Sequence, residues 1–364
     1  MLGFVAPCEN VFTDDEYIPS SSNYPYITCQ CYCVLDPRKN RVLFSKKMDE
    51  VREMASLTKI MTAILAIELA VELKLNLHKT WFKVSAYAAS MTGTTAGLIE
   101  CQRATIFDLL HGLMLPSGND AAMTLAENFS ERLRAVRKRP GQIKNPTVVD
   151  EKTGRVVGTN NGPEKKSYSS FVREMNKLAY KNHLRSTVYT NPHGLADKAN
   201  HSTAAELAHL ANYAMKNSVF RKIVSTKTHN GITYLTHRRF DRLFPHLCDD
   251  PEHQPLGGTD VPFETEMGTT FNKHNMVWHN SNRLLTVPGF SGVKTGITAT
   301  AGACLAVYYE NKDIKLFTIV LGSRNIEYRW KDTRRLTLWA DCMIQDQLTE
   351  GQLLQPQASP GKRF

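Results

Sequence analysis

The 364-residue sequence has no internal repeat and no apolar run long enough to cross a bilayer. The apolar run after Lys59 is interrupted by Glu68 and Glu72. The N-terminus has no basic segment, and four carboxylates break any apolar core there: Glu9, Asp14, Asp15 and Glu16. We therefore expect no transmembrane helix and no signal peptide, and the sequence leaves the localisation open.

Paired metal-ligand motifs are also missing, because the sequence contains no C-x-x-C and no H-E-x-x-H. His246, Cys248 and His253 could be zinc ligands, but the Asp- and Pro-rich stretch around them indicates a surface loop. This stretch belongs to a second expected insertion at about 230–268, rich in Pro and Gly. We expect no metal and no cofactor.

The eight cysteines do not form the pattern of a dense disulfide framework. Cys29, Cys31 and Cys33 alternate in an apolar run, which predicts a strand with all three side chains on one face. Neighbours on one face of a strand are about 6.6 Å apart with parallel Cβ vectors, which disfavours a bridge. Buried free thiols are the expected state, and a soft metal site is the alternative.

The net charge of +10 is partly local. Residues 132–144 hold six basic side chains and no acidic one, inside an expected inserted loop at 131–166. A solvated loop is the simpler interpretation, and attraction to an anionic polymer is the alternative. No aromatic stacking platform accompanies the charge, so we expect no nucleic-acid partner.

Three short motifs occur in order along the chain: Ser56-Leu57-Thr58-Lys59, Ser117-Gly118-Asn119 and Lys294-Thr295-Gly296. Together they supply a nucleophile, a base and a carboxylate-binding wall, which an acyl-transferring serine enzyme needs. Each motif alone is a weak signal, because other copies exist: S-x-x-K also begins at Ser291 and Ser359, S-x-N at Ser21 and Ser323, and K-T-G at Lys152.

Local context selects one copy of each. The segment after Lys59 contains no Gly or Pro and predicts a buried helix, which places Ser56 in its first turn and Lys59 one turn further. Ser291 leads into a strand, and Ser359 lies in the terminal tail. Lys294 precedes two apolar runs joined by a short polar turn, an antiparallel hairpin, whereas Lys152 lies in a polar turn.

The chain resembles the serine D-alanyl-D-alanine carboxypeptidases, the low-molecular-mass penicillin-binding proteins related to class A β-lactamases. The resemblance covers roughly residues 27–342 and includes Asn191-Pro192-His193-Gly194-Leu195, which is similar to the family's H-G-L turn. Gly118 in the middle of S-x-N is closer to the carboxypeptidases than to class A β-lactamases.

The resemblance implies an α/β (α+β) fold in which an antiparallel sheet is flanked by helices, with a mostly helical second lobe. The sheet would form from about 27–35, 41–45 and 291–321, covered by a helix near 330–344. Helices are expected at 56–73, 106–115, 120–136, 169–182 and 203–217. The expected boundaries are an N-terminal extension at 1–25, a catalytic domain at 26–345 and a polar tail at 346–364. Relatives often carry a further β-rich domain and a membrane anchor, for which this sequence shows no segment.

The resemblance also implies roles for individual residues. Ser56 would attack the terminal D-Ala–D-Ala bond of a peptidoglycan stem peptide, or a β-lactam. Lys59, its pKa depressed by desolvation, would act as base. Ser117 would relay the proton and Asn119 would bind the substrate amide and orient Lys59. The remaining expected substrate-binding residues are Lys294, Thr295, Gly296, Ile297, Thr298 and Arg329, with the N–H groups of Ser56 and Ile297 as oxyanion hole.

Other functions stay open at this point. A β-lactamase is the nearest alternative, although no E-x-x-L-N stretch lies between Ser117 and Lys294. A catalytically silent homologue or a peptidoglycan-binding receptor is the alternative of another class, and the intact Lys59 disfavours a receptor. An ordinary helix start at Ser56 would give the first motif without chemistry.

Overall fold

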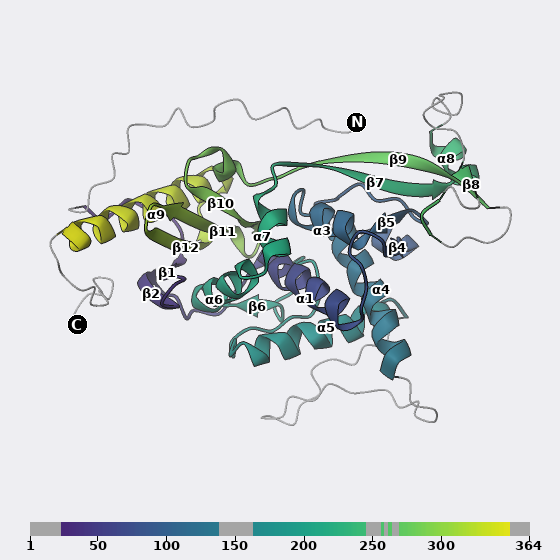
Figure 1. Cartoon of the computed structure of the whole chain (residues 1–364). Coiled ribbons are helices and arrows are strands. Elements are labelled where there is room, and N and C mark those ends of the chain that lie inside the picture. The colour runs from purple at the N-terminus through teal and green to yellow at the C-terminus, as the bar shows by residue number, and fades with distance from the viewer. Residues whose placement is uncertain (1–22, 138–162, 245–255, 258–260, 264–268, 350–364) are drawn as a thin grey trace, which may run out of the picture. The chain divides into compact units, whose positions relative to one another are not determined.

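A computed structural model describes residues 23–137, 163–244, 256–257, 261–263 and 269–349. The chain forms two compact units, coloured along the sequence in Figure 1. Unit 1 comprises residues 1–57, 196–227 and 280–364, and unit 2 comprises residues 58–195 and 228–279. The chain therefore passes from unit 1 to unit 2 directly after Leu57, between the expected nucleophile and the expected base.

Unit 1 contains a five-stranded antiparallel sheet with the order β10-β11-β12-β1-β2. Its strands are β1 (Cys31–Asp36), β2 (Arg41–Lys46), β10 (Phe290–Thr298), β11 (Gly302–Asn311) and β12 (Ile314–Ser323). The purple N-terminal strands lie beside the green C-terminal ones in Figure 1, because β1 pairs with β12 from Cys31–Leu321 to Leu35–Phe317. The expected sheet, built from both ends of the chain, is confirmed.

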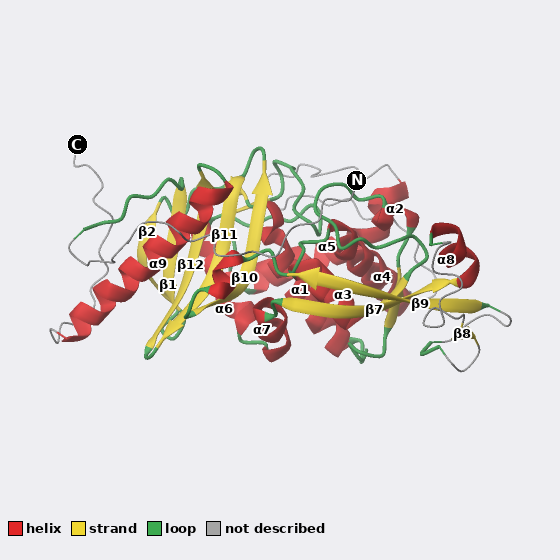
Figure 2. Cartoon of the chain, turned by 90° about the horizontal axis from the view of Figure 1, so that it is seen from above, coloured by secondary structure: helices red, strands yellow, loops and turns green. Residues whose placement is uncertain are grey.

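Helices cover both faces of this sheet. Helix α9 (Ile326–Thr349) lies along one face, as Figure 2 shows, and extends beyond the expected 330–344 at both ends. Trp330, Leu336 and Trp339 of α9 pack with the sheet residues Tyr32 and Val320 in one buried cluster. Against the sheet also pack α6 (Ala204–Met215) and α7 (Ser218–Ser225). The short elements of unit 1 are β3 (Arg52–Glu53), β6 (His201–Ser202), η1 (Ala55–Leu57) and η5 (Arg283–Thr286).

The three alternating cysteines are buried and unpaired, as expected, but they do not share one face. Cys29 belongs to the α9-side cluster with Tyr32 and Val34, which alternate with Cys31 and Cys33 along β1. The physical reason is an irregularity before β1, where the Gln30 N–H is shared between the carbonyls of Leu321 and Gly322. The prediction of one thiol face was therefore wrong. Burial raises the pKa of all three thiols.

Unit 2 is mainly helical, and α1 (Thr58–Glu72) runs through it. Most side chains of α1 are buried on all sides, which fits the absence of Gly, Pro and charge over its first ten residues apart from Lys59. The other long helices are α3 (Ile106–Met114), α4 (Asn119–Arg137) and α5 (Pro163–Lys181), and α2 (Ala86–Ala89) is a single turn. Thr105 caps α3, because its hydroxyl accepts a hydrogen bond from the Asp108 N–H.

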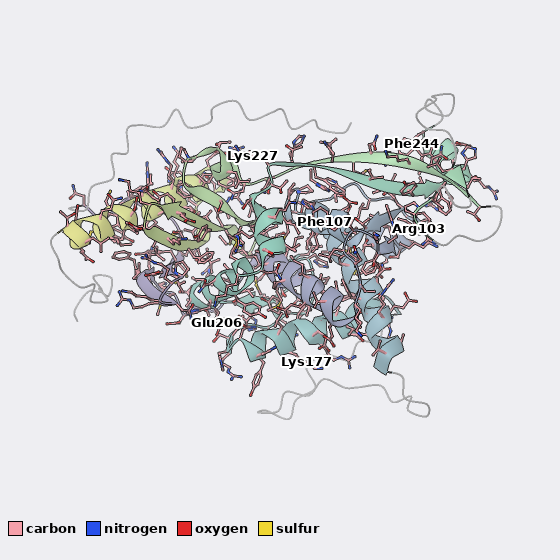
Figure 3. The ribbon with its side chains drawn as sticks, in the orientation of Figure 1. Arg103, Phe107, Lys177, Glu206, Lys227 and Phe244 are labelled. Atoms are coloured by element: carbon pink, nitrogen blue, oxygen red, sulfur yellow. The ribbon has the colours of Figure 1, made fainter. Side chains whose placement is uncertain are left out.

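Unit 2 also contains a sheet that the sequence did not predict, with the order β4-β5-β7-β9-β8. Its strands are β4 (Trp81–Lys83), β5 (Arg103–Thr105), β7 (Thr228–Thr236), β8 (Leu256–Gly257) and β9 (Thr270–His279), with α8 (His237–Leu243) after β7. The segment at about 230–268 was expected to be a structureless loop. Its first residues instead belong to β7, which pairs with β9 just beyond the segment, in register from Thr228–His279 to Thr236–Phe271. Phe107 of α3, labelled in Figure 3, packs edge-on against His229 of β7, with 5.8 Å between ring centroids.

The basic segment was expected to be a loop over 131–166. The structure shows that α4 continues to Arg137 and α5 begins at Pro163, so both ends of that range are helical. Residues 138–162, with Lys152 and half of the six basic residues of 132–144, lie outside the described residues. Within the described ranges, no helix has the length and apolar character needed to span a membrane.

Candidate active site

Ser56 lies in the 3-10 turn η1, directly before α1, and its side chain is partly exposed. The preceding residue, Ala55, has a left-handed backbone conformation with φ of 48°. Such a conformation is rare for a residue with a Cβ atom and is found most often where the fold imposes it at a functional position. The sequence predicted a helical turn at Ser56, and the structure gives a tight turn that leads into the helix.

Lys59 lies in the first turn of α1 and is completely buried. Its Nζ donates to Asn119 Oδ1 at 2.7 Å and to the backbone carbonyl of His193 at 2.6 Å. Burial lowers the pKa of the Lys59 ammonium from 10.5 to about 7, and the Asp120 carboxylate partly opposes this effect. A large fraction of Lys59 is therefore uncharged near neutral pH and able to accept a proton.

Ser117 lies on the turn that leads into α4, and Asn119 is the first residue of that helix. Ser117 has a φ of 68°, and its Oγ is buried without a hydrogen-bond partner among the residues that the structure describes. A buried polar atom without a partner costs about 1–3 kcal/mol and is uncommon. Asn119 donates from Nδ2 to the Thr92 carbonyl at 2.7 Å, while its Oδ1 accepts from Lys59. The predicted contact between Asn119 and Lys59 is present.

In unit 1, Lys294 and Thr295 lie on strand β10 and are both buried. Lys294 Nζ donates to the Thr295 carbonyl at 3.0 Å, and Thr295 Oγ1 lies 2.9 Å from Ser281 Oγ. Together these groups place an ammonium and two hydroxyls near the middle of the strand. This combination is suited to binding a carboxylate.

Gly296 brings β10 close to the turn that carries Ser56. A Cβ atom at Gly296 would lie 3.2 Å from the Met54 carbonyl oxygen, 3.2 Å from the Ser56 nitrogen and 3.3 Å from Ala55 Cβ. Those distances are tighter than ordinary contacts with a Cβ atom, so a side chain would push the strand away. Glycine at this position of the motif therefore permits β10 to approach the turn that carries Ser56.

The remaining predicted binding residues differ in their surroundings. Ile297 is 46% exposed. The Thr298 hydroxyl accepts from the Ala301 N–H at 3.0 Å, so it also holds the turn between β10 and β11. Arg329 on α9 is buried and donates to the carbonyls of Gly296 at 3.1 Å and Cys304 at 3.5 Å. Burial lowers the pKa of the Arg329 guanidinium to about 10, so it remains charged at neutral pH.

The other motif copies differ from these three. Ser291 lies in β10, in a strand, as the sequence predicted. Ser323 ends β12, and its neighbour Asn325 accepts from the Tyr328 N–H in the first turn of α9, which is a structural contact. Ser21, Lys152 and Ser359 lie outside the described residues.

Two parts of the site were missed from the sequence. The His193 turn was noticed, but its contribution is a backbone carbonyl rather than the ring. Burial, together with the Lys59 charge, lowers the pKa of the His193 imidazole to about 3, so the ring is neutral. Asp120 was also missed: its carboxylate accepts from the Ala96 and Leu98 N–H groups and ties the 92–98 loop (residues 92–98) to α4.

No group of three or more metal-ligating side chains occurs among the residues whose positions are described. Cys29 points to a different face from Cys31 and Cys33, which argues against the soft-metal alternative at these thiols. His246, Cys248 and His253 lie outside the described ranges.

Comparisons with known proteins agree with this geometry. A family model described as D-alanyl-D-alanine carboxypeptidase matches residues 19–135, 163–240 and 259–325. The chain is 28% identical over 298 residues to the D-alanyl-D-alanine carboxypeptidase of Streptomyces sp. (strain K15), covering 81% of this chain and 80% of that protein. It is 27% identical to the D-alanyl-D-alanine carboxypeptidase DacF of Bacillus subtilis (strain 168), covering 78% of this chain and 54% of that one. The chain thus spans about half the length of the Bacillus relative.

Solved structures confirm the fold. The crystal structure of the Streptomyces K15 DD-transpeptidase superposes with a TM-score of 0.65 at 25% identity, covering 88% of this chain and 99% of that chain. The D-alanyl-D-alanine carboxypeptidase DacD from Francisella tularensis superposes with a TM-score of 0.62 at 22% identity, covering 90% of this chain and 73% of that chain. The expected mixed α/β architecture of the DD-peptidases is confirmed.

Proposed function

The chain belongs to the D-alanyl-D-alanine carboxypeptidase family of serine peptidases, and on that basis we propose that it removes the terminal D-Ala from peptides ending in D-Ala–D-Ala. The reaction proceeds through an acyl-enzyme on Ser56. The single observation that carries this proposal is the complete burial of the Lys59 amine between Asn119 and the His193 carbonyl, which lowers its pKa to about 7. A lysine in that state is a competent base, whereas an exposed lysine is not.

In the first half of the reaction, Ser56 Oγ attacks the carbonyl carbon of the scissile amide while Lys59 accepts the Ser56 proton. The amide C–N bond breaks, and the expelled amine of D-Ala takes up the proton that Lys59 had accepted, which leaves Lys59 uncharged again. We assign the relay of this proton to Ser117, whose buried hydroxyl has no partner among the described residues. The cost of burying that hydroxyl unpaired is offset when it meets the reacting nitrogen.

In the second half, water attacks the ester carbonyl on Ser56 and gives a proton to Lys59. The bond between the acyl carbon and Ser56 Oγ then breaks, and Lys59 returns the proton to Ser56 Oγ as the shortened peptide leaves. The N–H groups of Ser56 and Ile297 are proposed to bind the oxyanion in both halves. Support comes from Gly296, which lets β10 approach the backbone nitrogen of Ser56. One N–H of Asn119 Nδ2 donates to Thr92, and we assign the other to the substrate amide.

The carboxylate of the terminal D-Ala is proposed to bind at Lys294 and Thr295, with Thr298 beside them. Lys294 supplies the positive charge, and because it is 1% exposed that charge acts in a medium of low dielectric constant. Arg329 donates to backbone carbonyls of β10 and β11, so we assign it to holding these strands under the carboxylate and not to direct contact.

β-Lactam antibiotics are proposed ligands of the same residues, because a strained lactam presents a carbonyl and a carboxylate in a similar relation. A β-lactamase remains the nearest alternative enzyme. The absence of an E-x-x-L-N stretch between Ser117 and Lys294 disfavours it. Transfer of the acyl group to an amine instead of water is a second outcome of the same acyl-enzyme, and the solved Streptomyces relative carries the name DD-transpeptidase.

The proposal is tested by incubating the purified protein with diacyl-Lys-D-Ala-D-Ala and measuring free D-Ala. We expect many turnovers for the wild type and none for Ser56→Ala. Ser291→Ala is the matched control, because it removes the serine of another S-x-x-K copy, and it should retain turnover. The absence of D-Ala release by a folded wild-type protein that still binds the peptide would favour the silent homologue.

A further inference from the structure

Trp278 on strand β9 lies against the loop that supports the proposed catalytic residues of unit 2. It is 4% exposed, and its indole Nε1–H donates to the Ala96 carbonyl at 2.8 Å. Ala96 belongs to the 92–98 loop. Strand β9 begins just after the expected insertion at about 230–268 and pairs with β7, so this contact connects the β7–β9 pair with the proposed site.

The indole ring fits a space that two glycines leave open. A Cβ atom at Gly231 on β7 would lie 2.6 Å from the Trp278 ring, and one at Gly112 on α3 would lie 3.4 Å from the ring and 3.0 Å from Ala96 Cβ. A Cβ atom at Gly118, in the S-x-N motif, would lie 2.8 Å from Ala96 Cβ. Ala96 is thus packed against Gly112 and Gly118, and the tryptophan ring also borders Gly112.

The 92–98 loop transmits this packing to Asn119 and Ser117. The Asn119 N–H donates to the Thr94 carbonyl at 2.8 Å, and the Asn119 side chain donates to the Thr92 carbonyl at 2.7 Å. Thr94 Oγ1 donates to the Ser117 carbonyl at 2.7 Å. Asn119 in turn accepts from Lys59. A continuous series of described contacts therefore runs from Trp278 to the proposed base.

We propose that Trp278 is a positioning residue for the acyl-transfer reaction: by holding the Ala96 carbonyl, it fixes the 92–98 loop and, through that loop, Asn119 and Ser117. This inference rests on the proposed function. Loss of the indole N–H leaves the buried Ala96 carbonyl without this donor, which favours a shift of the loop. A displacement of about 1 Å at a reacting group lowers a rate by up to roughly 100-fold.

The test compares Trp278→Phe with Trp81→Phe in the rate constant for acylation by a fluorescent penicillin. Trp81 lies on β4 of the same sheet, and its buried indole N–H has no hydrogen-bond partner among the described residues. The two substitutions therefore remove similar ring area, but only the first removes a hydrogen bond to the loop. We expect acylation to slow by about 10-fold or more in Trp278→Phe and by less than about 2-fold in Trp81→Phe.

Two further measurements separate positioning from a general loss of stability. In an Asn119→Ala background, Trp278→Phe should have a smaller additional effect on acylation than in the wild type, because the part of its effect that passes through the Asn119 side chain is already lost. Replacement of Trp278 by 3-benzothienylalanine keeps the bicyclic shape, removes the N–H, and covers the case in which Trp278→Phe does not fold. It should also slow acylation about 10-fold while the protein remains folded at the assay temperature.

Equal losses in the Trp81 and Trp278 variants, or a full additional loss in the Asn119→Ala background, would overturn the proposal. So would a benzothienyl protein that reacts at the wild-type rate. Absence of any acylation in the wild type would refute the proposed function and this inference with it, so the two failures are distinguishable.

Discussion

Asn119→Asp tests the electrostatic state of the proposed base. Asn119 Oδ1 lies 2.7 Å from Lys59 Nζ, so the substitution replaces a neutral acceptor by a carboxylate of nearly the same shape beside the buried amine. The wild-type pKa of Lys59 is lowered to about 7 by burial. A second carboxylate, in addition to Asp120, would favour the charged ammonium and raise that pKa.

The expected magnitude follows from the geometry. An opposite charge within hydrogen-bond distance raises the pKa of a cationic group by about 1–3, which would bring Lys59 to between roughly 8 and 10. The uncharged fraction at pH 7 would then fall by roughly 5-fold to 500-fold. Because only the uncharged amine accepts a proton, acylation increases as the pH rises through the pKa of Lys59. Asn119→Asp should therefore move this increase to higher pH.

The assay is the second-order rate constant for acylation by a fluorescent penicillin between pH 5.5 and 9.5. We expect the wild type to lose activity below about pH 7 and Asn119→Asp to recover much of its deficit near pH 9. Asn275→Asp is the control, because Asn275 is an exposed residue of β9 and the substitution adds the same charge at the surface. A deficit that is equal at every pH would refute the reasoning and limit Asn119 to substrate binding.

Lys59→Arg should nearly abolish acylation, because arginine stays protonated, whereas Lys294→Arg should retain part of it by keeping the charge; equal losses would contradict the division of roles. Lys59→Met should raise the free energy of unfolding by a few kcal/mol below pH 7, because it removes a buried charge. The stability difference between this variant and the wild type should shrink between pH 7 and 10.5, where the unfolded wild-type chain binds a proton that the folded protein has lost. A variant less stable than the wild type at pH 6 would contradict this prediction. Gly296→Ala should slow penicillin acylation about 10-fold or more by displacing β10 from Ser56. A wild-type rate in this variant would show that acylation does not depend on the close approach of β10. The wild type should release D-Ala over many turnovers but show a single burst with nitrocefin, since the tethered amine of the opened drug obstructs water; sustained nitrocefin turnover without D-Ala release would favour a β-lactamase.

The secondary structure that the sequence predicted well has strong local signals. The helix after Lys59 and the strands around Lys294 are long apolar runs with clear ends, and the structure places both within a few residues of the expectation. The predicted face of Cys29 was wrong, because the alternation of side chains along the strand breaks at Gln30, whose N–H is shared between two carbonyls. The β7–β9 pair was missed because its strands are separated by a segment rich in Pro and Gly, and their register depends on pairing over more than thirty residues.

In the candidate site, too, the residues with a local sequence signal were predicted and their long-range contacts were not. The residue types of Ser56, Lys59, Ser117 and Asn119 were evident from the motifs. Their supports are backbone groups and one buried carboxylate: the His193 carbonyl, the 92–98 loop and Asp120. Backbone carbonyls have no sequence signature, and an aspartate at the start of a helix is usually a capping residue. Such contacts depend on which distant segments the fold brings together.

The central claim is that Ser56 becomes acylated, and mass spectrometry of the penicillin-treated protein tests it most directly. Intact protein should gain the mass of one drug molecule, and the peptide that contains Ser56 should carry it. Ser56→Ala should remain unmodified while folded, and Ser291→Ala should be modified like the wild type. An adduct that persists in Ser56→Ala, or that maps to Ser291, would contradict the account.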